Sequence, residues 1–568
     1  MKKALSILTL LAVMATGCEK DNILNWDDPF NNDNQSGSAE GSSSGVSGST
    51  TASVESDEED NVAGTEFVRT IIITFSNSGD ATVTGDENGI VKVSGNQVTV
   101  DNTTTKEKVK YELYGSTTNG FLKIYSNNKQ ALVLNNVSIT NPNGAAINNQ
   151  GKKRCFVIVN GSNSLADGTS YTATPAEEDE KAAFFSEGQL IFSGSGSLTV
   201  TAQGKAGITS DDYIHLMDGP TLHVTSSAGH AVRGKDAVMV SGGTLQATAS
   251  AAMKKGITSD SLVVFNGGVT TVSVTGGPAY DSEDMEYKGT CGVKADKLFV
   301  MNAGSLTITN SGAGGKGISG DADAYFQGGT VNVTVTGNND TKSDKSAKGV
   351  KFDGNIYISG GSASVKSSHH EGIEAKGKME ITGGTVYAQA YDDAIGSAGN
   401  LAITNGFVCA YSTNNDGMDA NGNLYIEGGV TYAIGKGSPE VALDANTEKG
   451  YRLYINGGVL LAVGGLENSA VLSQKCYSAS SWTAKKWYSL TVGDNTYAFC
   501  MPEKGGSGLV VSGASQPTVK SNVTVTGGTQ VFNGMGVLEG TVSGGSNVSL
   551  SAYSGGGGGM PGGGPRGW

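Results

Sequence analysis

Apolar residues in the middle of the chain alternate with other residues instead of following a helical period. Ile356 and Ile358, Leu424 and Ile426, and Val331 and Val333 are pairs of this kind. Alternation rich in β-branched residues is typical of strands, whose side chains point to opposite faces in turn. The pattern therefore predicts an all-β chain built from short strands of about three to five residues.

The alternation recurs in units. Ten units begin with Gly or Ala followed by an apolar residue, and in nine of them a second turn mark, usually Gly-Gly, comes 11 residues later. Successive starts lie 22 to 25 residues apart, except in two units that carry polar inserts at 277–290 and 337–347. The starts are Gly207, Ala231, Gly256, Gly292, Gly317, Gly349, Gly372, Ala394, Gly417 and Ala442. Units of this length, with two or three strands and no helix, predict the coils of a parallel β-helix.

The repeat divides the chain. We predict a parallel β-helix over 66–466 and a C-terminal β cap over 467–553, where Thr491–Met501 and Asn522–Val531 have strand patterns. Ser, Gly, Asn and acidic residues predict a disordered tether over 18–65, and 554–568 is a Gly-rich tail. Trp482, Trp487 and Tyr488 in the cap either provide a platform for a sugar ring or cover the open end of the solenoid.

The N-terminus has the features of a secretion signal. Residues 1–17 combine two lysines with an apolar stretch too short to span a bilayer, and Ala15-Thr16-Gly17-Cys18 resembles a bacterial lipobox. This implies cleavage before Cys18 and lipidation of that cysteine; a secretory signal that happens to end near a cysteine is the alternative. We expect a lipid-anchored protein of the bacterial cell envelope, at the outer membrane or cell surface. A Cys476–Cys500 disulfide is left open by the sequence.

Charge and composition narrow the ligand class. The formal charge is −15, which argues against a nucleic-acid partner because phosphate binding needs a basic surface. The 85 glycines are concentrated partly in the ends and partly at the periodic turns, where glycine allows a left-handed backbone.

Acidic residues gather on adjacent coils late in the repeat. In earlier coils lysines and aspartates share the equivalent positions and can neutralise each other, but few lysines lie near the later group. Carboxylates stacked about 4.8 Å apart repel, and a calcium ion with six to eight oxygen ligands relieves this repulsion. A solvated acidic face without a bound ion is the alternative. The predicted calcium ligands are Glu371, Glu374, Asp392, Asp393, Asp416, Asp419 and Asp444.

Three polar residues beside this group are candidates for contact with a glycan. His369 and His370 directly precede Glu371, and both can donate hydrogen bonds to sugar hydroxyls. Asn421 follows Asp419 and can offer its carbonyl to a sugar or to calcium. A solvent-exposed histidine pair without a ligand is the alternative for His369 and His370.

Seven short motifs occur in a fixed order along the repeats, at 133–140, 144–147, 163–168, 207–212, 370–374, 392–395 and 416–422. Together they resemble the carbohydrate-binding β-helix family typified by a clostridial polygalacturonate- and cellulose-binding protein. The resemblance covers roughly residues 110–466 and implies a right-handed parallel β-helix, bound calcium, and binding instead of catalysis. Ala394 and Gly396 interrupt the acidic pattern, which weakens the middle of the predicted site.

These observations predict a monomeric, non-enzymatic lipoprotein that binds acidic polysaccharide, pectin-like polygalacturonate in particular, through calcium. Calcium can bridge protein and sugar carboxylates, so a chain of charge −15 can hold a polyanion. One alternative is a calcium-dependent polysaccharide lyase on the same fold, with Lys376 or Lys378 as its base. Another is a structural adhesin whose charged columns bind no glycan.

Overall fold

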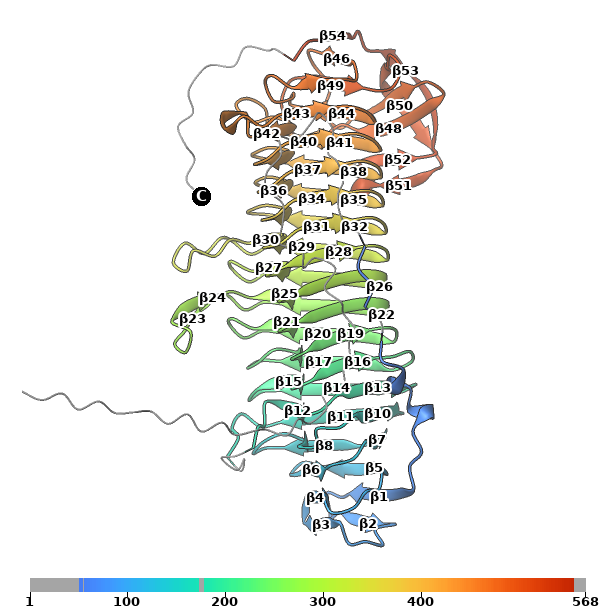
Figure 1. Cartoon of the computed structure of the whole chain (residues 1–568), viewed down its shortest axis with the longest axis vertical. Coiled ribbons are helices and arrows are strands. Elements are labelled where there is room, and N and C mark those ends of the chain that lie inside the picture. Colours follow the sequence, from blue (N-terminus) through green and yellow to red (C-terminus); the bar gives the residue numbers. More distant parts are fainter. Residues whose placement is uncertain (1–50, 55, 173–177, 556–568) are drawn as a thin grey trace, which may run out of the picture.

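The repeating starts and the alternating residues after them fold into strands that stack coil upon coil along one long axis (Figure 1). The structure is a computed structural model, and it describes residues 51–54, 56–172 and 178–555. The predicted signal peptide, Cys18, most of the predicted tether and the tail from residue 556 lie outside the described residues. Within them the chain is all-β and parallel over the coils, as predicted, and contains no α-helix.

Each coil contributes strands to three faces. Face 1 is one 15-stranded sheet, and each predicted unit start lies within one of its strands or directly before it. Its strands are β3 (Val91–Ser94), β4 (Asn96–Asn102), β6 (Gly120–Ser126), β9 (Ile147–Asn149), β12 (Ala182–Ser186), β15 (Ala206–Ser210), β18 (Val232–Gly234), β21 (Lys255–Ser259), β25 (Cys291–Ala295), β27 (Lys316–Gly320), β30 (Lys348–Phe352), β33 (Ile373–Ala375), β36 (Ile395–Ser397), β39 (Met418–Ala420) and β42 (Leu443–Ala445).

Face 2 follows the first corner of each coil. Its strands are β7 (Gln130–Asn135), β10 (Cys155–Asn160), β13 (Leu190–Gly194), β16 (Tyr213–Leu216), β19 (Ala237–Val240), β22 (Leu262–Val274), β26 (Leu298–Asn310), β28 (Asp323–Phe326), β31 (Ile356–Ile358), β34 (Met379–Ile381), β37 (Leu401–Ile403), β40 (Leu424–Ile426), β43 (Leu453–Ile455) and β45 (Val471–Leu472). The long strands β22 and β26 continue around the Gly corner onto Face 3.

Face 3 completes each coil. Its other strands are β8 (Ser138–Asn141), β11 (Ser162–Asp167), β14 (Ser197–Ala202), β17 (Thr221–Ser226), β20 (Thr244–Ala249), β29 (Thr330–Val335), β32 (Ser362–Ser367), β35 (Thr385–Ala390), β38 (Phe407–Ser412), β41 (Val430–Ile434) and β44 (Val459–Val463). At the N-terminal end, β1 (Arg69–Phe75) and β2 (Thr82–Thr84) pair antiparallel, and β5 (Val109–Thr117) joins β1 to the first coils.

The register confirms the predicted repeat. Val350 pairs with Ile373 and Ile373 with Ile395, so the apolar residues after successive starts stack inside the solenoid. The start itself must be small, because a Cβ on Gly317 would lie 2.2 Å from Cγ1 of Val333. At the second corner, Gly384 has a φ of 78°, a left-handed conformation that other residues rarely adopt.

Both polar inserts leave the solenoid on the same side (Figure 1). The first forms a hairpin of β23 (Ala279–Asp281) and β24 (Glu286–Lys288). The second, at 337–347, contains an antiparallel bridge between Asp340 and Lys345. Their shared position follows from their shared place in the repeat.

The N-terminal segment 51–68 packs along the outside of Face 2, which differs from the predicted tether. In Figure 1 this blue segment descends beside the solenoid to β1, and it contains the 3-10 turns η1 (Glu58–Asp60) and η2 (Val62–Gly64). Val54, Val62 and Phe67 cover outward apolar residues such as Phe156 and Tyr213. The prediction of a disordered tether is therefore wrong for residues 51–54 and 56–65, because it ignored the apolar outer stripe on Face 2.

A buried polar network fixes this segment. Asp60 is 1% exposed and accepts a hydrogen bond of 2.8 Å from Nε of Arg154, which is 3% exposed. Its other oxygen lies 2.6 Å from Nδ1 of His215, whose Nε2 lies 2.8 Å from Oγ of Ser241. Asp57 adds a second ion pair to Arg154, at 2.7 Å.

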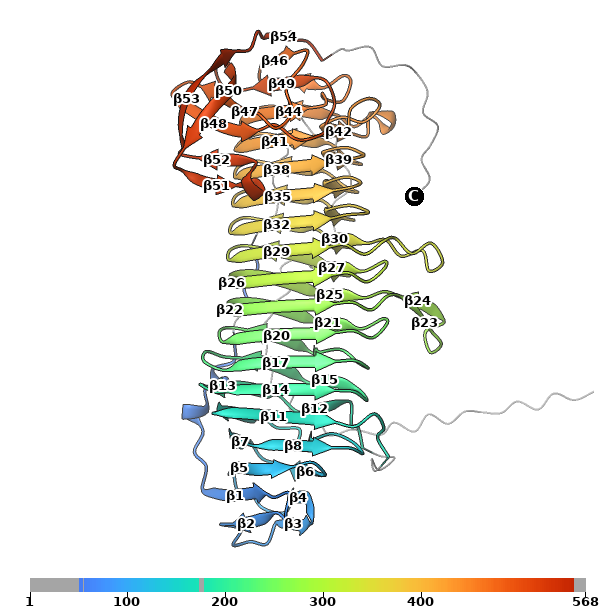
Figure 2. The ribbon, with the colours of Figure 1, turned by 180° about the vertical axis from the view of Figure 1, so that it is seen from behind.

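The C-terminal residues cover the last coils. An antiparallel sheet of six strands lies beside β35, β38 and β41 (Figure 2), and its apolar side packs on outward residues such as Tyr432 and Leu461. The cap strands are β46 (Cys476–Ala479), β47 (Trp487–Val492), β48 (Asn495–Cys500), β49 (Leu509–Ser512), β50 (Thr518–Thr526), β51 (Thr529–Val531), β52 (Gly536–Leu538), β53 (Thr541–Asn547) and β54 (Ser551–Tyr553), with the turn η4 (Phe532–Gly534). The turn η3 (Thr447–Lys449) belongs to the solenoid, between β42 and β43.

The cap settles two open points. Trp482 donates a hydrogen bond of 2.7 Å to the Gly506 carbonyl and packs with the cap core, and Tyr488 is buried there, which favours a covering role over a sugar platform. Cys476 and Cys500 are both free thiols, so the disulfide is not formed. Across the described residues, no helix has the length and apolar character needed to cross a membrane.

We expect Asp60→Ala to loosen segment 51–68. The change removes one ion-pair partner of the buried Arg154 guanidinium. We expect this to lower the stability of the packed segment by about 3 kcal/mol. Hydrogen exchange of the backbone amides in 51–68 measures the effect and should become faster. Glu58→Ala removes the same charge from an exposed position of the same turn and should leave exchange unchanged. Equal exchange rates in the two variants would contradict the assigned role of the network.

Candidate functional site

The acidic residues predicted as a site stack in two adjacent columns on Face 1. In the outward column of the strands, Glu374 pairs with Gly396, Gly396 with Asp419, and Asp419 with Asp444. In the column just before the strands, Gly372 N donates to Asp393 O and Ala394 N to Asp416 O, so Glu371, Asp393 and Asp416 also follow one another. The columns derived from the repeat are therefore present in the structure.

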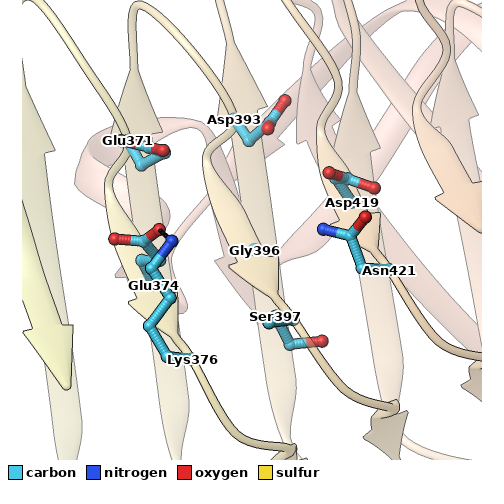
Figure 3. Close-up of a pocket in the computed structure, with 9 residues that line it drawn as sticks. Glu371, Glu374, Lys376, Asp393, Gly396, Ser397, Asp419 and Asn421 are labelled. Carbon is cyan, nitrogen blue, oxygen red and sulfur yellow. Dashed lines mark ion pairs between the residues drawn. The ribbon is translucent and has the colours of Figure 1, made fainter. Parts of the chain in front are cut away.

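A small hollow lies between these columns (Figure 3). Gly396 lies at its middle, and a Cβ on this residue would meet only the Asp419 carbonyl oxygen, at 3.9 Å. The space amounts to about 10 Å³, room for one water-sized sphere. We call it the acidic hollow; it is lined by Glu371, Glu374, Lys376, Asp393, Gly396, Ser397, Ala398, Asp419 and Asn421. The interruption at Gly396, expected to weaken the site, instead creates the space in it.

Lysines neutralise one wall of the acidic hollow. Nζ of Lys348 lies 2.6 Å from Glu374 and 3.3 Å from Glu371, and Lys376 lies 2.7 Å from Glu374. These two carboxylates raise the pKa of the largely buried Lys348 despite the opposing effect of burial. The expectation that few lysines lie near the late acidic group is thus wrong for Glu371 and Glu374, since Lys348 reaches over from the previous coil.

The opposite wall carries carboxylates that repel one another. Asp393 is largely buried, and burial together with the charges of Asp419 and Asp416 raises its pKa well above the usual value. One Asp393 oxygen accepts a hydrogen bond of 3.1 Å from the Asp416 amide. This wall favours either a bound proton or a bound cation.

Asp444 extends the same arrangement by one coil. Burial, a hydrogen bond with Glu467 and the charges of Asp416 and Asp419 raise the pKa of Asp444 to about 11. At neutral pH, without a cation, Asp444 therefore keeps its proton. Glu467 follows the last regular coil, where the repeat pattern ends, which is why the column did not reveal it.

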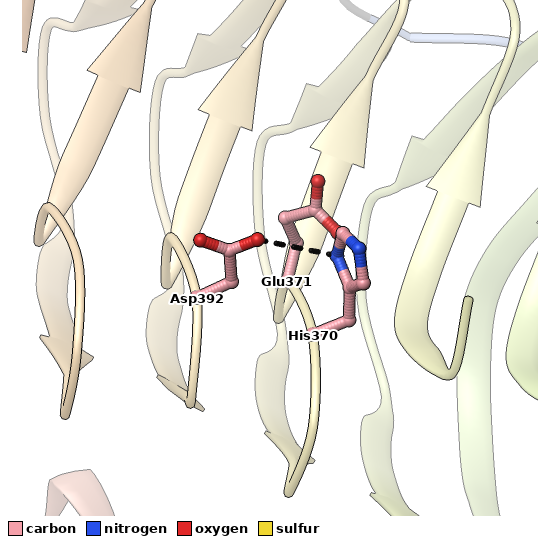
Figure 4. Close-up of side chains that lie close together, drawn as sticks. All are labelled: His370, Glu371 and Asp392. Carbon is pink, nitrogen blue, oxygen red and sulfur yellow. Dashed lines mark hydrogen bonds and ion pairs between the residues drawn. The ribbon is translucent and has the colours of Figure 1, made fainter. Parts of the chain in front are cut away.

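A second group lies at the corner just outside the acidic hollow (Figure 4). Nδ1 of His370 contacts the Glu371 carboxylate and lies 3.4 Å from Asp392. Burial favours the neutral form of Glu371, but the hydrogen bond from His370 and the charge of Lys348 outweigh it and lower its pKa to about 2. Burial and the neighbouring Glu371 raise the pKa of Asp392, which accepts a hydrogen bond of 2.8 Å from Asn415.

The ten predicted site residues on the coils therefore do not form one site but lie in several places. Glu371, Glu374, Asp393, Asp419 and Asn421 line the acidic hollow. His370 and Asp392 form the corner group, while Asp416 accepts from the Val441 amide at 2.5 Å and Asp444 contacts Glu467. The carbonyl of His369 instead accepts a hydrogen bond from Asn339 in the second insert, at 3.1 Å. Cys18 lies outside the described residues.

Comparison with known proteins identifies the family. A family model described as "Carbohydrate-binding domain-containing protein" matches residues 94–394, more than half of the chain. The chain belongs to this family. Membership in a carbohydrate-binding family supports a polysaccharide as the partner of this chain. The matched region of the chain includes Glu371, Glu374, Asp392 and Asp393.

Two further comparisons complete the picture. A solved structure titled "Structure of the polysaccharide lyase-like protein from C. thermocellum, Gadolinium derivative" is 21% identical, covers 46% of this chain and 96% of that chain, and has a TM-score of 0.36. No curated protein matches this family member.

We expect Asp444→Asn to flatten the pH dependence of stability in chelator. The raised pKa means that the folded chain binds a proton that the unfolded chain loses near its usual value of 3.8. The stabilisation that this proton provides is complete below the usual pKa. It is lost as pH rises toward about 11, and the free energy of unfolding falls by up to about 1.4 kcal/mol per pH unit.

The melting temperature between pH 5 and pH 8 measures this slope. The unsubstituted chain should lose stability over this range, and Asp444→Asn should lose less. Asp296→Asn is the matched control, because Asp296 lies on an earlier coil and contacts Lys294. Parallel melting curves for all three proteins would show that Asp444 does not hold the proton.

Proposed function

We propose that the protein is a non-enzymatic binder of acidic polysaccharide, with pectin-like polygalacturonate as its ligand, that acts through calcium held in the acidic hollow. The observation that carries the proposal is the wall of Asp393 and Asp419, where burial and the charge of Asp419 raise the pKa of Asp393. A divalent cation relieves this repulsion without a proton. Membership in a carbohydrate-binding family supports the ligand class.

The residues present fit calcium. This ion prefers six to eight oxygen ligands, including carboxylates, amide carbonyls and water. Asp393, Asp419 and the amide oxygen of Asn421 would hold it on one wall, and Glu371 and Glu374 face it from the other (Figure 3). The space for one water-sized sphere suits one ion, and among the described residues no soft sulfur ligand lines the acidic hollow.

Calcium also explains how an acidic protein holds an acidic sugar. A protein of charge −15 repels polygalacturonate at long range. An ion with coordination positions left for solvent can accept a sugar carboxylate as a further ligand, which reverses the local charge. Lys376 at the rim adds a positive group beside Glu374.

We expect Asp419→Asn to weaken calcium binding at least tenfold, because the change removes a charged oxygen ligand from the ion, and tenfold corresponds to about 1.4 kcal/mol. Isothermal titration calorimetry with calcium chloride measures it. Asp392→Asn is the matched control in the corner group and should change the affinity little. The reverse result would place calcium with His370, Glu371 and Asp392 instead.

Glycan binding is measured on the same proteins. Polygalacturonate immobilised on beads should retain the unsubstituted chain in calcium and release it in chelator, and Asp419→Asn should be retained poorly. Retention that ignores both calcium and this substitution would overturn the calcium-bridged mode. A chain retained by no glycan, with no calcium uptake, would leave the adhesin hypothesis.

A polysaccharide lyase remains the second candidate because one lysine lies at the site. Lys376 lines the acidic hollow, whereas Lys378 contacts Glu380 and lies 5.5 Å from the Tyr357 ring on Face 2. Of the two lysines considered as a base, only Lys376 is therefore in place. Unsaturated uronate products, absent with Lys376→Met, would support the lyase and overturn the binding protein.

We further propose that Cys18 carries a lipid anchor and that the protein acts as an envelope-bound monomer. Cys18→Ser should move the protein from the membrane fraction of bacterial cells to the soluble fraction, because a single cysteine supplies the acyl chains. Ser6→Ala, within the apolar part of the signal, is the control and should leave the anchor intact. Unchanged fractionation of Cys18→Ser would contradict lipidation.

A further inference from the structure

A second, larger hollow lies where the cap meets the solenoid. It measures about 480 Å³, within the range of small-ligand sites. Its floor is the outward side of β35 and β38 near their C-terminal ends, and one rim is the loop that follows β48. We call it the cap hollow; it is lined by Gln389, Tyr391, Tyr411, Thr413, Asn414, Glu503 and Lys504.

Tyr391 is an exception in its column. In the eight coils from β17 to β38, the residue directly after the Face 3 strand donates its amide to the preceding coil, and this residue is Ser or Thr in the seven coils other than that of Tyr391. Those residues are Ser227, Ser250, Thr275, Ser311, Thr336, Ser368 and Thr413. At 49% exposure, the Tyr391 ring leaves apolar surface in water. The solenoid does not need an aromatic residue here, so the repeat gives no structural reason for it.

The other tyrosine of the cap hollow anchors its floor. Tyr411 is only 7% exposed and packs with the apolar residues under the cap. Burial raises its pKa, while the backbone amide of Lys504 hydrogen-bonds its hydroxyl and opposes this rise. The contact fixes the 503–504 loop beside the solenoid.

Amide side chains with fixed positions surround these rings. Gln389 pairs in register with Tyr411, and its Oε1 accepts a hydrogen bond of 2.8 Å from the Tyr387 hydroxyl. Oδ1 of Asn414 accepts a hydrogen bond of 3.0 Å from Nζ of Lys436. In both residues the amide oxygen already accepts a hydrogen bond. The NH₂ group is therefore the one that can donate to a ligand.

The charge at the cap hollow is opposite to that of the whole chain. Glu503 forms an ion pair of 2.9 Å with Lys485, so its charge is compensated. Lys504 at the rim and Lys436 beside Asn414 add two positive groups, in a chain whose formal charge is −15. Donor amides, ammonium groups and an exposed ring together favour an anionic ligand with an apolar face.

We propose that the cap hollow is a calcium-independent subsite for a uronic acid residue of the bound polysaccharide. The sugar ring packs its C–H face on Tyr391, the amides of Gln389 and Asn414 donate to its hydroxyls, and Lys504 pairs with its carboxylate. The choice of sugar rests on the proposed function. Tyr391 lies two residues before Asp393, within about 7 Å of chain, so one polysaccharide can reach both hollows.

The test is carried out in chelator, which separates the two sites. Tri-galacturonate is titrated into the full chain, and saturation-transfer NMR reports which sugar protons contact the protein. We expect weak binding without calcium, a loss of at least tenfold with Tyr391→Ala, and a similar loss with Lys504→Gln. Tyr391→Phe should retain binding, because it keeps the ring. Cellotriose, which lacks the carboxylates, should bind the unsubstituted chain less tightly than tri-galacturonate.

Tyr114→Ala is the matched control, since Tyr114 is 36% exposed on β5 at the other end of the solenoid. It should leave binding in chelator unchanged. Binding in chelator that survives Tyr391→Ala would overturn the subsite, as would binding seen only in calcium, which would leave the proposed function intact. Binding in chelator that depends on Tyr391, without any calcium-dependent retention, would support the subsite and overturn the calcium-bridged mode.

Discussion

The spacing between coils determines which side chains of this protein contact one another. Parallel strands lie about 4.8 Å apart, so each side chain has the equivalent side chain of the next coil as its nearest neighbour. Apolar residues then build a continuous core, as Val350, Ile373 and Ile395 do. Charged residues instead lie beside residues of the same charge, unless positive and negative residues alternate from coil to coil. The early coils place Lys294 between Asp296 and Asp321, whereas the late coils bring Asp393, Asp416 and Asp419 together. A site arises where this compensation stops.

The outer surface obeys a second constraint, because a solenoid with apolar residues on its outside must cover them. Segment 51–68 covers Face 2 of the early and middle coils, and the cap covers Face 3 of the last coils. Each cover is fixed by polar contacts, the network of Asp60 and Arg154 for the segment and the amide of Lys504 for the cap loop. Among the described residues, Face 1 of the late coils, which carries the acidic columns, takes part in neither of these apolar clusters.

The features that the repeat determines could be predicted from the sequence. The unit starts, the Gly corners, the strand pairs and the two acidic columns follow from periodicity, because stacking converts equal offsets into spatial neighbours. Contacts that cross the repeat escaped prediction. Asp60 meets His215 across 155 positions of sequence. Lys348, in contrast, lies one coil before Glu371 in the same column, so its ion pairs with Glu371 and Glu374 follow from the stacking and were overlooked. Gly396 was misjudged because a missing side chain was counted as a lost ligand, when here it leaves space beside Asp393 and Asp419.

The two hollows lie on the same coils for a physical reason. Tyr391 lines the cap hollow and Asp393 lines the acidic hollow, and the two residues lie two positions apart at one corner of the solenoid. In the proposed binding mode, calcium in the acidic hollow binds the carboxylate of one sugar residue, and Tyr391 packs on the C–H face of another residue of the same polymer. Two weak sites joined by one polymer bind more tightly than either alone, because the second contact forms at a high local concentration. A solenoid that departs from its own repeat in two columns of one coil thereby acquires a surface suited to a chain-like ligand.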